Sequence, residues 1–108
     1  MNKICCVEDD SAILTALQYT LGQEGYEVMT AMTKTQGLEL IQQESFDLVL
    51  LDVTLPDGSG YEICKRMRED SRLKEIPVIF LTACDDEVNI VMGLDLGADD
   101  YKIGRAHV

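Results

Sequence analysis

Three carboxylates and one hydroxyl stand where short apolar runs of this sequence end. Glu8 and Asp9 follow the first run, Asp52 follows a later one, and Thr82 follows the last. Each run is apolar without alternation, which is typical of a strand covered on both faces of a parallel sheet. Since the carboxyl ends of parallel strands lie at one edge of such a sheet, we expect the four side chains to share one small site.

Three carboxylates held this close repel one another. At ~5 Å and an effective dielectric of ~20, each like-charge pair costs about 3 kcal/mol, so the group either takes up protons or binds a cation. Oxygen ligands without His or Cys favour Mg²⁺, which keeps several waters and accepts phosphate oxygens as further ligands. A carboxylate at such a site can form an acyl phosphate. Asp52 is the candidate nucleophile, and Thr82 is a candidate donor to a phosphoryl oxygen.

Each of these residues also has an ordinary structural interpretation. Glu8, Asp9 and Asp10 could be solvated acids at a helix N-terminus, where negative charge is favourable. Asp52 could begin a loop without any further role, and Thr82 could cap a helix or a turn. Their coincidence at the ends of apolar strands favours the functional interpretation.

The elements that position these residues alternate between strands and helices. The predicted strands are 4–7, 26–31, 48–51 and 77–81, and a fifth strand begins near the end of the chain. The predicted helices are 11–23, 33–45, 59–70 and 85–96. Strands separated by helices imply right-handed crossovers, so we expect a doubly wound α/β fold with a parallel sheet and helices on both faces.

Length, charge and composition exclude several classes of protein. The 108 residues suit one small domain, and a formal net charge of −11 argues against a standalone nucleic-acid binder. No apolar run approaches the ~18 residues of a membrane span, and no signal peptide is visible. Four cysteines without a C-x-x-C pair, and a single histidine, argue against a zinc site and fit small buried side chains in a cytoplasmic protein.

Four stretches carry a more specific pattern: VEDD, LLD followed by LPDGSG, LTA, and GLDLGADDY. From about residue 3 to residue 101 the chain resembles a response-regulator receiver domain, the phospho-acceptor half of bacterial two-component signalling. The resemblance implies a flavodoxin-like sheet with strand order 2-1-3-4-5, an order taken over from a chemotaxis member of the family. Residues 81–101 are most similar to receivers attached to winged-helix DNA-binding domains, which implies a transcription regulator that reaches DNA only through an output domain.

The resemblance also implies a role for each site residue. Asp52 would accept the phosphoryl group from a sensor histidine kinase. Glu8, Asp9 and Asp52 would hold Mg²⁺ together with the backbone carbonyl of Thr54. The chain would thus be a phosphoacceptor with Mg²⁺-dependent self-phosphorylation and dephosphorylation chemistry rather than an enzyme.

Thr82 and Tyr101 would form the switch pair that reports phosphorylation. The threonine hydroxyl would move toward the phosphoryl group while the aromatic ring turns inward, so that a local charge change biases a two-state element. The helix expected from Glu87 to Leu96 is apolar nearly all round. One of its faces is therefore left over after packing on the sheet, and we expect it to form a partner surface, with a homodimer as one such contact.

The sequence departs from the family pattern at its end. The family has a lysine three residues after the switch aromatic, where this chain has Gly104, and Lys102 does not take over that role. The fifth helix is missing, so we expect a receiver domain over 1–102 that is incomplete at its C-terminus. The tail 103–108 fits no receiver, and one reverse translation of it matches a common sequencing-library adapter, so we interpret it as non-native.

Two other functions compete with the phosphoacceptor. The missing lysine favours a degenerate receiver that acts as a phosphate-independent binding module, whereas the intact acids favour phosphoryl acceptance. A phosphatase that uses an aspartyl phosphate would usually need a second acid two residues after Asp52. Thr54 stands there, which argues against that class of enzyme.

Overall fold

The computed structural model describes residues 2–84 and 87–91, and for residues 82–84 and 87–91 it describes the backbone. The main sheet contains β1 (Lys3–Val7), β2 (Glu27–Ala31), β3 (Leu48–Asp52), β6 (Val78–Cys84) and β7 (Glu87–Val91). Its strands lie in the order β2-β1-β3-β6-β7. A small antiparallel hairpin is formed by β4 (Thr54–Leu55) and β5 (Gly58–Ser59), and the helices are α1 (Ser11–Gln23), α2 (Lys34–Gln43) and α3 (Gly60–Arg68).

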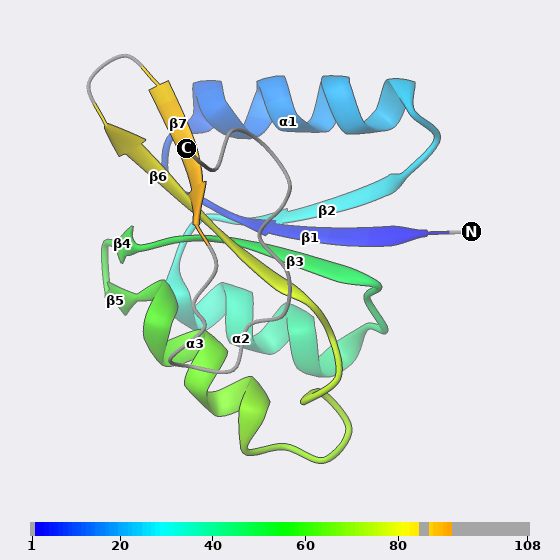
Figure 1. Cartoon of the computed structure of the whole chain (residues 1–108), viewed down its shortest axis with the longest axis vertical. Helices are drawn as coiled ribbons and strands as arrows, with labels where there is room; N and C mark the ends of the chain where they lie inside the picture. Colours follow the sequence, from blue (N-terminus) through cyan, green and yellow to red (C-terminus); the bar gives the residue numbers. More distant parts are fainter. Residues whose placement is uncertain (1, 85–86, 92–108) are drawn as a thin grey trace.

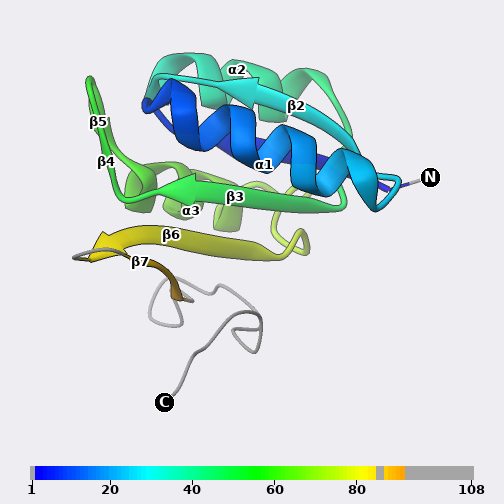
Figure 2. The same cartoon turned by 90° about the horizontal axis from the view of Figure 1, so that it is seen from above.

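The helices cover both faces of the sheet, with α1 on one side and α2 and α3 on the other (Figures 1 and 2). The adjacent residues Cys5 and Cys6 of β1 show this division, because Cys5 belongs to the apolar layer that contains Ile41 and Ile63, and Cys6 to the layer that contains Leu14. Both cysteines are fully buried. Successive side chains of a strand point to opposite faces, so a strand enclosed on both sides has to be apolar throughout.

Local signals place the helices as the sequence predicts. Asp10 caps α1, accepting hydrogen bonds from the backbone N–H groups of Ala12 and Ile13 at 2.9 and 3.2 Å. Gly25, with a φ of 93°, stands just after the end of that helix, a position that favours glycine. Ser59 and Glu62 form a capping box at the start of α3.

The parallel, doubly wound fold is confirmed, since β2, β1, β3 and β6 lie in that order and pair in parallel. The predicted order 2-1-3-4 is therefore found, with β6 as the fourth strand of the sheet. Strand β2 forms one edge of the sheet. Within the part of the chain that the structure describes, no helix is long and apolar enough to cross a membrane.

The helix predicted from 85 to 96 is wrong over Glu87–Val91, which forms the antiparallel strand β7. This strand lies beside β6, at the position in the sheet where the fifth strand was expected. Three of its five residues, Val88, Ile90 and Val91, are β-branched, and such side chains favour strands over helices. The partner surface predicted on that helix therefore loses its basis over these residues. Tyr101, Gly104 and the tail 103–108 lie outside the described residues.

Candidate metal-binding site

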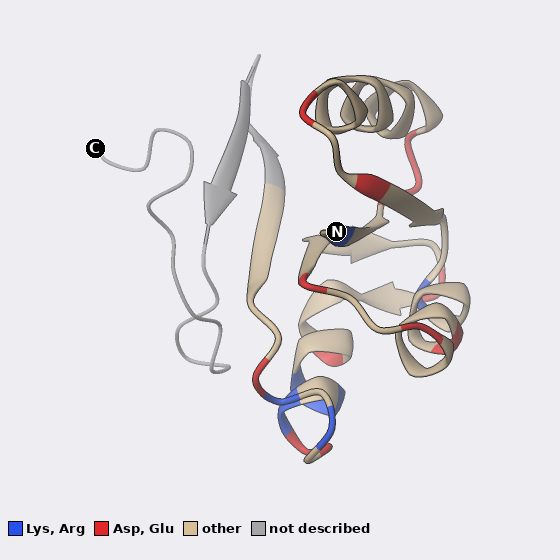
Figure 3. Cartoon of the chain, turned by 90° about the vertical axis from the view of Figure 1, so that its right-hand side faces the viewer, with Lys and Arg blue, Asp and Glu red and all other residues tan. Residues whose placement is uncertain are grey.

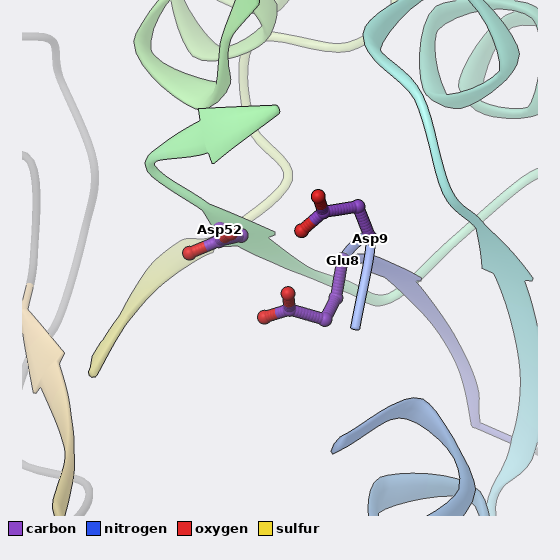
Figure 4. A group of neighbouring side chains, drawn as sticks. All are labelled: Glu8, Asp9 and Asp52. Atoms are coloured by element: carbon purple, nitrogen blue, oxygen red, sulfur yellow. The ribbon is translucent and has the colours of Figure 1, made fainter. Parts of the chain in front are cut away.

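Three carboxylates gather at the carboxyl edge of the sheet (Figure 4). Glu8 and Asp9 follow β1 directly, and Asp52 is the last residue of β3. The two strands are parallel neighbours in register, with Val7 opposite Leu51, so their ends coincide. One carboxylate oxygen of each of the three residues lies within 4.8 Å of the others. The topology thus brings together side chains that are more than forty positions apart in the sequence.

Glu8 is a buried acidic side chain, with 4 % of its surface exposed. The pKa of its carboxyl is raised to about 7, mainly by burial and also by the nearby Asp52 and Asp9, while a hydrogen bond that the Asp10 N–H donates to Glu8 Oε2 at 3.0 Å acts in the opposite direction. Near neutral pH this group is therefore divided between its protonated and ionised forms.

The pKa of Asp52 is raised as well. Burial is the main cause, and the charges of Asp9 and Asp10 add to it, while hydrogen bonds from Glu8 and from the Val53 backbone act in the opposite direction. A buried acid and a half-buried acid, both with raised pKa values, thus lie beside the exposed Asp9. Full ionisation of this site costs free energy unless a counter-charge is present.

The donor set fits a hard divalent cation. All three side chains offer carboxylate oxygens within reach of one point, and oxygen-only ligand sets suit Mg²⁺ better than softer metals. A cation there would remove the mutual repulsion and the penalty for burying the charge of Glu8. Thr54 begins β4 two residues after Asp52, so its backbone carbonyl is a candidate for a further ligand.

The peptide that follows Asp52 is fixed from the N-terminus of α3. The N–H of Gly60 donates a hydrogen bond to the carbonyl of Val53 at 2.9 Å. A Cβ atom on Gly60 would overlap the backbone carbonyl oxygen of Asp52, so this close approach requires glycine. The sequence places Gly60 within the predicted helix 59–70 but does not single it out. A glycine at the first helical position, directly after a serine cap, is the signal that could have identified it.

Of the two predicted switch residues, the structure describes only the backbone of Thr82. Thr82 follows Leu81, the residue opposite Asp52 in the β3–β6 register, and its backbone pairs with Asn89 of β7. Its side chain is not described. Tyr101 lies outside the described residues, so the switch pair stays a prediction.

Charge is divided between the two ends of α3. Its first turn contains the acidic Glu62, and its last turn contains Lys65, Arg66 and Arg68 (Figure 3). The helix dipole is positive at the N-terminus and negative at the C-terminus, so acidic side chains at the first end and basic side chains at the second stabilise a helix. The basic turn is therefore explained by the helix itself, and Arg68 also donates to the carbonyls of Lys74 and Ile76 in the loop before β6.

A family model and several known proteins match most of this chain. The family model described as "Response regulator receiver domain" matches residues 4–102. The transcriptional regulatory protein AfsQ1 of Streptomyces coelicolor is 43% identical over 103 residues, which make up 95% of this chain and 44% of that protein. The alkaline phosphatase synthesis transcriptional regulatory protein PhoP of Bacillus subtilis is 44% identical over 99 residues, covering 92% of this chain and 40% of that protein. The chain thus spans less than half the length of these relatives.

Solved structures are similar over most of the chain. The non-phosphorylated HemR receiver domain from Leptospira biflexa has a TM-score of 0.75 at 33% identity and covers 91% of this chain and 77% of its own. A putative response regulator from Chloroflexus aurantiacus has a TM-score of 0.81 at 32% identity, covering 93% and 82%. The response regulator TrrA from Thermotoga maritima, solved in complex with Mg²⁺ and BeF, has a TM-score of 0.73 at 34% identity, covering 78% and 71%.

Proposed function

The chain belongs to the response regulator receiver domain family, and from that premise we propose that Asp52 accepts a phosphoryl group from a sensor histidine kinase, with Mg²⁺ held by Glu8, Asp9 and Asp52. The observation that carries the proposal is the meeting of these three carboxylates within 4.8 Å at the carboxyl edge of the sheet. Ligands of open parallel α/β sheets bind at this edge.

In the proposed transfer, an Asp52 carboxylate oxygen attacks the phosphorus of a phosphohistidine. The new O–P bond forms as the P–N bond to the imidazole breaks, and the departing nitrogen keeps the electron pair and takes up a proton. The product on this chain is an acyl phosphate. Bound Mg²⁺ supplies positive charge opposite the phosphoryl oxygens. Glu8 and Asp9 act by holding that charge beside Asp52, and the Thr54 carbonyl is proposed as a further ligand.

Thr82 and Tyr101 are proposed to pass the change on. The hydroxyl of Thr82 would donate to a phosphoryl oxygen, and the ring of Tyr101 would turn inward with it. Support for the position of Thr82 comes from the register, because the residue before it lies opposite Asp52. An added phosphoryl charge would thereby change a partner surface.

The output is proposed to be control of transcription in the cytoplasm, through an output domain of the parent protein. The support is that two relatives at 43% and 44% identity are transcriptional regulatory proteins more than twice as long as the matched region. A second candidate is a binding module that takes no phosphate. The observation that favours it is Gly104 at the position of the family's lysine.

The test is incubation of the chain with acetyl phosphate and Mg²⁺, read by intact mass. We expect wild type to gain the mass of one phosphoryl group and to lose this gain with EDTA or in Asp52→Asn. Asp47→Asn is the matched control, because Asp47 is an exposed aspartate that directly precedes β3, at the opposite end of the strand from Asp52. No mass change in wild type with Mg²⁺ would support the binding module, and steady phosphate release from many substrates would indicate a phosphatase.

A further inference from the structure

Asp57 ties the hairpin that follows Asp52 to the beginning of another helix. The hairpin pairs Leu55 with Gly58, so Pro56 and Asp57 form its tip. The carboxylate of Asp57 accepts hydrogen bonds from the backbone N–H groups of Lys34 at 2.6 Å and Thr35 at 3.0 Å, and from the Thr35 hydroxyl at 2.8 Å. These contacts join residues that are 22 and 23 positions apart in the sequence.

The contacts of Asp57 complete the N-terminus of α2. Thr33, the N-cap, accepts a hydrogen bond from the third helical N–H, that of Gln36, at 3.0 Å. Asp57 accepts from the first and second helical N–H groups, which no residue within a helix can satisfy. Its negative charge also lies at the positive end of the helix dipole. Hydrogen bonds from Lys34 and Thr35 lower the pKa of Asp57 to about 2, so the carboxylate remains charged at neutral pH.

A second contact closes the hairpin against α3. Lys34 Nζ lies 3.1 Å from Glu62 Oε1, and the same oxygen accepts the Ser59 N–H at 3.1 Å. Gly58 of β5 lies between these two side chains, since a Cβ there would be 2.6 Å from Glu62 Oε1 and 2.7 Å from Lys34 Cδ. The hairpin is thus held at its tip by α2 and along β5 by side chains of α2 and α3.

The hairpin is continuous with the site. Its first residue, Thr54, lies two positions after Asp52. The carbonyl of Val53, between them, accepts a hydrogen bond from the N–H of Gly60 at the base of the hairpin. The carbonyl of Asp52 is in contact with Gly60, so little free chain separates the site from the hairpin. A shift of the hairpin therefore has to change the backbone of Asp52, Val53 or Thr54.

From this geometry we propose that Asp57 is a positioning residue of the site: by holding the β4–β5 hairpin to α2, it fixes the Asp52–Thr54 backbone for metal binding. The proposal rests on the proposed function of Asp52 and names a residue that acts on that site through the hairpin. Asp57 itself is exposed and is not one of the three clustered carboxylates.

The test is Mg²⁺ titration by calorimetry of wild type, Asp57→Ala and Asp57→Asn in the full chain. Asp47→Ala is the matched control, because Asp47 is likewise exposed and accepts a backbone N–H, that of Lys3, at 2.8 Å. Titrations are run at a temperature at which circular dichroism shows every variant fully folded. Removing residues that orient metal ligands typically weakens metal binding by about 10-fold to 100-fold, and we expect roughly 10-fold for Asp57→Ala.

Asp57→Asn keeps one acceptor oxygen, so we expect it to recover part of the Mg²⁺ affinity, which general destabilisation would not explain. The proposal is overturned if Asp57→Ala binds Mg²⁺ within twofold of wild type, or if Asp47→Ala is weakened equally. Should Asp57→Ala not fold, Asp57→Asn replaces it, and a Mg²⁺ affinity equal to that of wild type would then overturn the proposal. Failure of the proposed function is read separately: wild type would gain no phosphoryl group from acetyl phosphate, whatever the Asp57 variants do.

Discussion

Gly60 lies so close to the backbone carbonyl oxygen of Asp52 that a Cβ atom at that position would overlap it. The first residue of α3 thereby sets the direction in which β3 ends. The Asp52 side chain lies beside those of Glu8 and Asp9 (Figure 4), on a backbone that is held on one side by β1 and contacted on the other by this glycine.

Gly60→Ala is therefore expected to displace Asp52. Extra atoms in a packed position cost about 1–3 kcal/mol of stability, and Mg²⁺ affinity should fall as well because the Asp52 carboxylate moves. Urea denaturation and Mg²⁺ titration measure the two effects. Gly22→Ala in α1 is the control, since nothing lies within 4 Å of a Cβ there, and it should raise stability by roughly 0.5–1 kcal/mol. Equal stability and metal binding in Gly60→Ala and wild type would contradict the prediction.

The stability of the metal-free protein should decrease from acid to neutral pH. Burial raises the pKa of Glu8 to about 7 in the folded state, against an ordinary value of 4.5. Below pH 4.5 the Glu8 carboxyl is protonated in both the folded and the unfolded protein. Between pH 4.5 and about 7 the unfolded chain releases a proton that the folded chain keeps. The free energy of unfolding therefore falls as pH rises through this window. Urea denaturation in EDTA from about pH 5 to about pH 8 measures the slope, and Glu8→Gln should flatten it.

Mg²⁺ affinity should have the opposite pH dependence. A carboxylate has to be ionised to bind a metal, so binding to Glu8 releases a proton wherever the group is still protonated. Affinity should increase with pH up to about 7, the pKa of Glu8, and then level off. Calorimetry in two buffers of different ionisation enthalpy counts the released protons. A proton release that is the same well above and well below this pH would contradict the assignment.

Asp52→Asn should abolish phosphoryl acceptance and yet stabilise the metal-free protein. The substitution removes one of three carboxylates that repel one another. The loss of this repulsion should raise the free energy of unfolding by on the order of 1–3 kcal/mol at neutral pH. Added Mg²⁺ should stabilise wild type more than the variant, because wild type gains more from a counter-charge. Thermal melting with and without Mg²⁺ tests both statements, and a variant less stable than wild type in EDTA would contradict them.

The stabilisation that Asp57 provides should be lost in strongly acid solution. Its pKa is lowered from 3.8 to about 2 by the N–H groups of Lys34 and Thr35. The stabilisation is thus present in full above the unfolded value and is lost as pH falls through about 2. We expect Asp57→Asn to have a shallower decline of stability in this acid range than wild type. Denaturation curves of the two proteins, with Asp47→Asn as control, measure the difference.

Much of the fold could be predicted because single features of the sequence decide it. Uninterrupted apolar runs mark the parallel strands, and Asp10, Ser59 and Gly25 mark helix ends through contacts within a few residues. The approach of Glu8 and Asp9 to Asp52 follows from topology alone, since parallel strands in register end at the same edge.

What the sequence did not reveal depends on competition or on distance. Glu87–Val91 is apolar and β-branched, so it can serve as a helix face or as a strand, and pairing with the edge of β6 decides between them. The bonds from Lys34 and Thr35 to Asp57 cross more than twenty residues. A Pro-Asp-Gly turn indicates a reversal of the chain, but it carries no information about which helix its carboxylate meets.

The two neighbouring thiols of β1 can report how fast the apolar layers of the protein open to solvent. Cys5 and Cys6 are sealed into opposite apolar layers, and burial raises the pKa of both thiols to about 12, so almost no reactive thiolate is present at neutral pH. An alkylating reagent can reach either sulfur only after the helices on that side have lifted. Peptide mapping of the alkylated chain would therefore compare the rates of local opening of the two apolar layers. Cys5 reports on one layer and Cys6, one residue away, reports on the other.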